Sequence, residues 1–182
     1  MQELSLNVLD IVQNSIRAGA SLITISIQER TADHFMEISI SDNGCGMSEE
    51  QVASVMDPFF TTRTTRKVGL GVPLFRMSAE GTGGTFSIRS KLGEGTTTTA
   101  TYVTNHLDML PLGDMNATMI SLISVNPQLD FVYHHQVDDR EFQLDTRELR
   151  AVLEDVPLST PDVLLFIKEM IAENTAQLYG KS

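Results

Sequence analysis

Alternating apolar and polar residues predict two strands early in the chain and two more near residue 100. Residues 22–28 alternate and are rich in β-branched side chains, and residues 35–41 mostly alternate. Residues 85–90 and 96–103 alternate as well, and a glycine-rich turn joins them. Each of these last two strands is expected to bury one face only.

Helical spacing predicts a first helix over residues 3–18, ended by an Ala-Gly-Ala sequence. On this helix Asn7, Asp10, Asn14 and Arg17 form a narrow polar stripe, and apolar residues cover most of the other side. The stripe is either a solvated face or a row of ligand-binding groups. Because asparagine is a mediocre helix former, its repeated use here favours binding.

Two shorter helices are predicted further along. The first begins after Ser48, with Ser48 as N-cap and Gln51 at the capping-box position, and ends near Met56. The second covers about residues 72–79, with Pro73 in its first turn, where the missing N–H is not needed.

Residues 42–47, Asp-Asn-Gly-Cys-Gly-Met, directly follow the second strand. The strand fixes the carboxylate of Asp42, and the glycines let a planar ligand lie against bare backbone. A single aspartate can accept a hydrogen bond from an exocyclic amine, as at the edge of adenine. Asp-Asn-Gly is also an ordinary turn, so these six residues alone support both interpretations.

Residues 57–67 combine paired phenylalanines, threonines and a basic cluster. This pattern indicates a loop anchored by Phe59 and Phe60, whose Arg and Lys side chains either contact phosphate or are solvated. Gly69 and Gly71 follow and open a helix. Backbone N–H groups at a helix N-terminus bind anions, so the sequence predicts a phosphate site here.

Composition narrows the classes of partner and compartment. The chain has 182 residues, a formal net charge of -11 and 41% hydrophobic residues, enough for one substantial domain with an extension. This acidity makes nucleic acid and anionic lipid poor partners. One cysteine excludes an internal disulfide, and neither a signal peptide nor a membrane span is evident. A cytoplasmic protein is expected.

Residues 105–182 carry no motif with a recognisable chemistry. A connector near Pro111 leads to residues 117–125, which fit a helix or a strand equally well, and then to a predicted hairpin over 131–144. Residues 146–153 and 162–178 read as helices. This part either extends the sheet or packs as an adaptor surface. The histidines, His34, His106, His134 and His135, are expected to be structural or solvent-facing, and Cys45 to pack as a small residue.

Five motifs occur in a fixed order: residues 10–20, 42–47, 57–62, 69–71 and 90–96. Together they resemble the GHKL ATPase superfamily of gyrase, heat-shock chaperone, histidine kinase and mismatch-repair ATPases. The resemblance covers about residues 3–103. It implies an α+β, two-layer sandwich called the Bergerat fold, a mixed sheet covered by helices on one face. Residues 1–104 would form the ATP-binding domain and residues 105–182 a small α+β extension.

The resemblance also implies roles for individual residues, with ATP and Mg²⁺ as cofactors. Asn14 matches the metal-binding asparagine, Asp42 the carboxylate that reads the adenine amine, and Thr96 a residue that supports this contact. Residues 57–72 match the loop that covers ATP, called the lid. The implied nucleotide-binding set is Asn14, Arg17, Asp42, Gly44, Gly46, Met47, Phe59, Thr61, Thr62, Arg63, Lys67, Gly69, Leu70, Gly71 and Thr96.

The chain departs from the superfamily pattern in two places. Hydrolysing relatives usually carry glutamate where this chain has Asp10, which would be a shorter catalytic base or only a polar residue lining the site. Lys67 and Val68 stand where many kinases have another glycine. Residues 59–62 look most like the histidine-kinase branch, and residues 14–20 are also similar to the mismatch-repair branch.

Three functions are compatible with these motifs. The first is a protein kinase or phosphotransfer module that acts in trans on an unidentified protein partner. Because the motifs start near residue 4, the helical hairpin that carries the phosphoacceptor histidine in histidine kinases is not expected upstream of them. The second is an ATP-gated binding module with little turnover, and the third is a scaffold with decayed motifs. The oligomeric state stays open.

Overall fold

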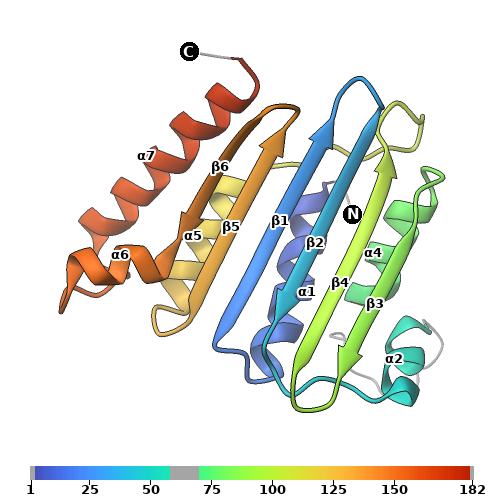
Figure 1. The fold of residues 1–182 in the computed structure, drawn as a ribbon, viewed down its shortest axis with the longest axis horizontal. Coiled ribbons are helices and arrows are strands. Elements are labelled where there is room, and N and C mark those ends of the chain that lie inside the picture. Colours follow the sequence, from blue (N-terminus) through green and yellow to red (C-terminus); the bar gives the residue numbers. More distant parts are fainter. Residues whose placement is uncertain (1–2, 58–69, 181–182) are drawn as a thin grey trace.

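A single six-stranded mixed sheet runs through the protein, with strand order β3-β4-β2-β1-β5-β6 (Figure 1). The computed structural model describes residues 3–57 and 70–180. Neighbouring strands are antiparallel except β1 and β5, which are parallel. The strands are β1 (Leu22–Arg30), β2 (Phe35–Asp42), β3 (Phe86–Lys91), β4 (Gly95–Val103), β5 (Asp130–Val137) and β6 (Arg140–Asp145).

Helices cover one face of this sheet. Figure 1 shows α1, α4 and α5 behind the strands, α2 near the end of β3, and α7 along the edge formed by β6. In the described part of the chain, no helix combines the length and the apolar character needed to cross a membrane. The helices are α1 (Leu4–Arg17), α2 (Glu49–Met56), α4 (Gly71–Glu80), α5 (Met115–Val125), α6 (Thr146–Leu153) and α7 (Pro161–Leu178).

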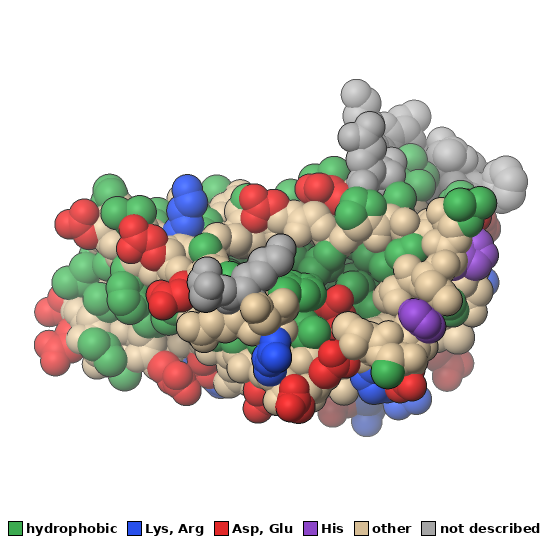
Figure 2. Space-filling view, turned by 90° about the horizontal axis from the view of Figure 1, so that it is seen from above, with side chains coloured by type: hydrophobic (Ala, Val, Ile, Leu, Met, Phe, Trp, Pro, Cys, Tyr) green, Lys and Arg blue, Asp and Glu red, His purple; other side chains and the backbone are tan. Residues whose placement is uncertain are grey.

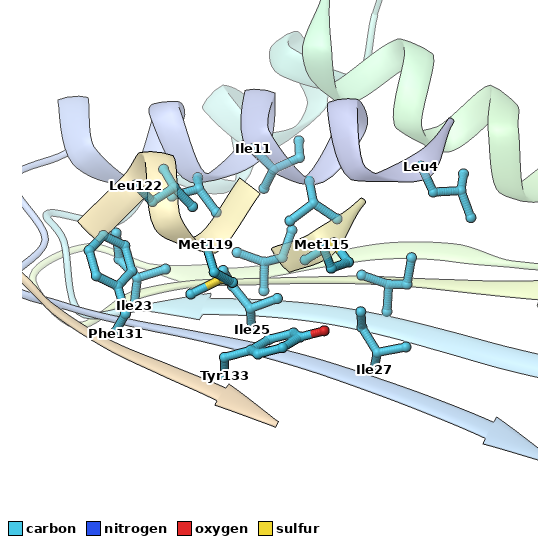
Figure 3. Close-up of a cluster of buried hydrophobic side chains, with 14 of the residues drawn as sticks. Leu4, Ile11, Ile23, Ile25, Ile27, Met115, Met119, Leu122, Phe131 and Tyr133 are labelled. Carbon is cyan, nitrogen blue, oxygen red and sulfur yellow. The ribbon is translucent and has the colours of Figure 1, made fainter. Parts of the chain in front are cut away.

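The core lies between the helices and the inner face of the sheet. Ile23, Ile25 and Ile27 alternate along β1 and are all 0% exposed. Ile25 pairs with Ile40 on one side and Tyr133 on the other, so the apolar face continues across the sheet. Figure 3 shows the side chains of β1 and Tyr133 packed against α1 and α5. Burying each such side chain contributes about 1.5–3 kcal/mol, which fixes which face of each strand points inward.

The edge strand β3 differs in burial from its neighbour β4. Thr98, Ala100 and Tyr102 alternate along β4 and are buried, as expected for a strand that buries one face, whereas no residue of β3 is buried, contrary to the expectation. Phe86 is half-buried and meets Phe75 of α4 edge to face, with the ring centroids 5.7 Å apart. An edge strand has a neighbour on one side only, so its inward side chains stay partly open.

The C-terminal part extends the same sheet. β5 pairs with β1 over eight positions, from Leu22 opposite Asp130 to Glu29 opposite Val137. The predicted hairpin is β5 and β6, and residues 117–125 belong to the helix α5. The sheet therefore crosses the predicted boundary at residue 104, and the division into an ATP-binding domain and an extension stays a prediction.

Residues of the connector also hold the start of α1. The backbone N–H groups of Leu4 and Ser5 donate to the carbonyls of Pro111 and Leu112, at 2.9 and 2.8 Å. The first N–H groups of a helix have no partner within it, so these carbonyls supply the missing acceptors. At α2 the predicted capping box is confirmed, with Ser48 and Gln51 bonded to each other's backbone N–H.

Candidate nucleotide-binding site

Asp42 stands at the end of β2 and is held from two directions. Its Oδ2 accepts a hydrogen bond from Ser15 Oγ of α1 at 2.6 Å, and its Oδ1 accepts one from Gly44 N at 2.8 Å. Two donors on different elements fix the plane of the carboxylate. Each oxygen keeps a free lone pair, so Asp42 can still accept from the amine of a ligand.

Gly44 and Gly46 allow the loop after β2 to pack tightly against the rest of the protein. A Cβ on Gly44 would lie 2.9 Å from the carbonyl oxygen of Ala18, and one on Gly46 only 2.0 Å from that of Lys91. Gly46 also has φ +72°, which favours glycine. The space left by the missing side chains is therefore filled by the protein's own backbone. Between these glycines Cys45 is exposed, and so the expectation that it packs as a small residue was wrong.

Thr96 lies opposite Asp42 in the pairing of β2 with β4. Its Oγ1 is 2.7 Å from Ser90 Oγ, which also accepts from the backbone N–H of Met47 at 2.7 Å. Met47, Ser90 and Thr96 thus form a hydrogen-bonded group beside Asp42. Sequence reasoning singled out neither Ser90 nor Ser15 as a support, although both lie in the motifs that were recognised.

The polar stripe of α1 is divided by burial. Asn14 Oδ1 accepts from Arg17 Nη1 at 2.8 Å on the exposed side. Asp10 is half-buried, and Asn7 is 0% exposed with no hydrogen-bond partner for its amide among the described residues. The stripe predicted as one continuous polar face is therefore open only from Asp10 onward.

The carboxyl of Asp10 lies in a distinctive environment. Partial burial raises its pKa, and the positive charge of Arg17 opposes this shift. A Cβ on Gly71, the first residue of α4, would lie 3.1 Å from Asp10 Cβ. The start of α4 therefore lies directly against Asp10. Asn14 is one turn further along the same helix, α1.

Part of the predicted lid lies outside the described residues, namely Phe59, Thr61, Thr62, Arg63, Lys67 and Gly69. Leu70 is the first described residue after that gap, 38% exposed, and serves as the N-cap of α4. The helix begins at Gly71, one residue earlier than predicted. Its N-terminal N–H groups are the described part of the candidate phosphate site.

The described residues fit ATP with Mg²⁺. Asp42 offers a fixed acceptor for an adenine amine, and the start of α4 offers N–H groups for phosphate. No group of three or more His, Cys, Asp or Glu that could hold a metal occurs in the described part of the chain. Mg²⁺ usually binds through one or two protein ligands together with phosphates and waters, so the lack of such a group does not conflict with a role of Asn14 as a single protein ligand.

Comparison with known proteins identifies the family. The sequence family described as "Histidine kinase-, DNA gyrase B-, and HSP90-like ATPase" matches residues 2–106, more than half of the chain. The chain belongs to this GHKL ATPase family. The family confirms the resemblance drawn from the five motifs and assigns an ATP-binding domain of the histidine-kinase-like type to this part of the protein.

Two GHKL relatives are bacterial kinases. Sporulation kinase B of Bacillus subtilis (strain 168) is 34% identical over 95 residues, which cover 50% of this chain and 22% of the kinase. Sensor histidine kinase ZraS of Escherichia coli (strain K12) is 31% identical over 91 residues, covering 50% of this chain and 19% of ZraS. The match therefore spans about a fifth of each relative.

Solved structures confirm the fold. The ATPase domain of MutL from Aquifex aeolicus, complexed with ADP, matches 100% of this chain and 70% of its own, with a TM-score of 0.51 and 14% identity. The N-terminal domain of a DNA repair protein matches 80% of this chain and 53% of its own, with a TM-score of 0.54 and 15% identity. The GHKL architecture, an α+β sandwich with a mixed sheet, agrees with the prediction.

Proposed function

We propose that this GHKL protein binds ATP with Mg²⁺ and transfers the terminal phosphoryl group to a protein partner. The observation that carries the proposal is the geometry of Asp42, which is fixed by Ser15 and Gly44 and keeps acceptor capacity. Ser15 also connects this carboxylate to the helix that carries Asn14 and Asp10. One carboxylate and one carboxamide are thus presented from two elements bonded to each other.

Each side chain would have a separate task. Asp42 would accept from the adenine amine, and the Met47–Ser90–Thr96 group would hold the wall beside it. Asn14 would hold Mg²⁺, which neutralises charge on the phosphates when bound. Binding of Mg²⁺ would require Asn14 Oδ1 to exchange the hydrogen bond with Arg17 for the metal.

Asp10 would act as the general base. A carboxyl whose pKa is raised by burial is a stronger base than an exposed one, and it lies on the same helix as the proposed metal ligand. It would accept the proton from the attacking group of the partner. Sporulation kinase B and ZraS, the two relatives described above, both carry the name kinase. This supports phosphotransfer rather than binding alone.

Radiolabelled ATP tests this function directly. The full chain, Mg²⁺ and a lysate are incubated with ATP labelled at the γ or at the α phosphate. The proposal requires a labelled protein band with the γ label only, lost with Asp10→Asn and with Asp42→Asn. If no band above background appears while a thermal shift still reports Mg·ATP binding, the transfer step is wrong.

The second candidate is a module whose affinity for a partner depends on ATP and which turns ATP over slowly. Asp10 favours it, because this side chain is one methylene shorter than the glutamate of hydrolysing relatives. Only a difference in affinity can drive such a switch. Equal affinity of a captured partner with and without Mg·ATP would therefore rule out this function. For both candidates, the acidity of the chain supports a cytoplasmic protein partner rather than nucleic acid or a membrane.

A further inference from the structure

A cavity lies in the C-terminal part, away from the proposed ATP-binding residues. Its volume is about 230 Å³, and its walls come from residues 112–116 at the start of α5, from β5 and from the last turns of α7. Figure 2 shows hydrophobic side chains in a hollow near the middle of the upper surface, and acidic side chains spread around it. Ligand pockets for drug-sized molecules usually span about 300–1,000 Å³, so this cavity suits a smaller ligand.

A chain of hydrogen-bonded polar groups forms one wall, in which Tyr133 and His135 are buried and Tyr179 is 42% exposed. His135 is 1% exposed, and its Nε2 lies 2.7 Å from Glu29 Oε2. The hydroxyl of Tyr179 donates to the same oxygen, and the hydroxyl of Tyr133 lies 3.4 Å from His135 Nδ1. The contacts join β1, β5 and the residue after α7, although Glu29 and His135 are far apart in sequence.

Both tyrosines in this wall stay protonated. Burial is the main cause that raises the pKa of Tyr133 and of Tyr179, and the charge of Glu29 raises both further. The phenols therefore add no negative charge, and their rings present aromatic surface to the cavity. The carboxylate of Glu29, whose side chain is 13% exposed, supplies negative charge behind them.

Asp114 and Asn116 also line the cavity. Asn116 Nδ2 donates to the carbonyl oxygen of Lys168 at 3.2 Å, which fixes the orientation of the amide. Its Oδ1 is buried and has no hydrogen-bond partner among the described residues. Asp114 is exposed and adds a carboxylate to the lining, and none of the described residues that line the cavity is Lys or Arg.

We propose that this cavity binds a small primary ammonium ion on an apolar body, such as a short-chain alkylamine. The ammonium group would be attracted by the carboxylates of Asp114, which lines the cavity, and of Glu29 behind the tyrosines. Aromatic rings stabilise a nearby cation by about 0.5–2 kcal/mol, and Tyr133 and Tyr179 provide two. A carboxylate of the same shape would be repelled by the same charges.

Three probes of equal shape test the charge preference. Isobutylammonium, isobutanol and isobutyrate are titrated into the ¹⁵N-labelled full chain, and the amide shifts of residues 113–116 and 133–135 are followed by NMR. The proposal requires saturable shifts at these amides with isobutylammonium, at an affinity at least about tenfold above that for isobutanol. It is overturned if the three probes bind alike, if isobutyrate binds best, or if no shift appears at these amides.

Two pairs of variants locate the binding. Ala172→Leu narrows the cavity, and its control Ala117→Leu places the same side chain on an exposed position of α5 outside the lining. Asp114→Asn keeps the N-cap of α5, which accepts from Ala117 N, but removes the charge. Its control is Asp162→Asn, at an exposed position in the first turn of α7.

The expected result is a loss of isobutylammonium affinity of about tenfold with Ala172→Leu and about threefold with Asp114→Asn, and none with the controls. Retained dispersion of the NMR spectrum shows that each variant is folded. If Asp114→Asn has no effect while Ala172→Leu abolishes binding, the cavity is merely apolar and the preference for a cation is refuted. If neither variant weakens binding, the probe binds elsewhere.

Discussion

Ser15 donates its hydroxyl to the carboxylate of Asp42 at 2.6 Å, which ties the first helix to the end of the second strand. Ser15 is 3% exposed, so its hydroxyl has little access to water as an alternative partner. Ser15→Ala is expected to cost about 2 kcal/mol of the free energy of unfolding, because it removes a buried hydrogen bond to a charged group. Urea denaturation measures this loss.

The control is Ser87→Ala, at an exposed position of β3, which should leave the urea midpoint unchanged. An equal loss of stability in the two variants would contradict this role of Ser15.

Replacing Asp42 by asparagine should remove the preference for adenine. The amide keeps the shape but loses the charge and one acceptor oxygen, so ATP binding should weaken by roughly tenfold or more. Binding of GTP, which does not present the same amine, should change little. Thermal shifts with both nucleotides report the ratio, with Asp33→Asn in the exposed turn between β1 and β2 as control. An unchanged ratio of ATP to GTP affinity would show that Asp42 does not read the base.

Asp10 predicts a pH dependence of stability with a defined sign. Its pKa is raised in the folded state, so the folded protein binds more protons than the unfolded chain as pH rises above the ordinary aspartate value. The stabilisation is therefore present below the unfolded pKa and is lost as pH rises through the folded pKa. Asp10→Asn should gain stability relative to the wild type between about pH 3 and neutral pH in urea titrations. A constant difference over this range would contradict the raised pKa.

Asn7→Leu is expected to stabilise the protein. The amide of Asn7 is 0% exposed and has no hydrogen-bond partner among the described residues, and leucine has the same number and branching of side-chain heavy atoms without polar atoms. Removing an unpaired buried amide should add about 1–3 kcal/mol to the free energy of unfolding. The control Gln13→Leu, a half-buried position on the same helix, should change it far less. A loss of stability with Asn7→Leu would mean that the amide has a partner.

Local signals in the sequence were sufficient for most of the first hundred residues. The alternation in β1 and β2, the capping box at Ser48 and the order of the five motifs predicted the elements and the family. These features depend on residues only a few positions apart, so they can be recognised in the amino-acid sequence. The fold could be predicted for the same reason, because proteins that share the GHKL motifs also share one fold.

Other features depend on distant contacts that no local pattern reveals. Residues 117–125 are apolar on most sides because α5 packs between the sheet, α1 and α7, so helix and strand could not be told apart. The pairing of Glu29 with His135 exists only because β1 and β5 run parallel in one register. The burial of Asn7 was equally hidden, since its spacing matches the exposed residues of the stripe.

The parallel pairing of β1 with β5 has a consequence for attempts to isolate the ATP-binding part. A protein ending at residue 104 would leave the backbone groups of Leu22–Arg30 unpaired along one side, and bare strand edges recruit other chains. It would also lack the carbonyls of Pro111 and Leu112 that receive the first N–H groups of the opening helix. Such a fragment is expected to self-associate rather than to behave as an independent nucleotide-binding unit.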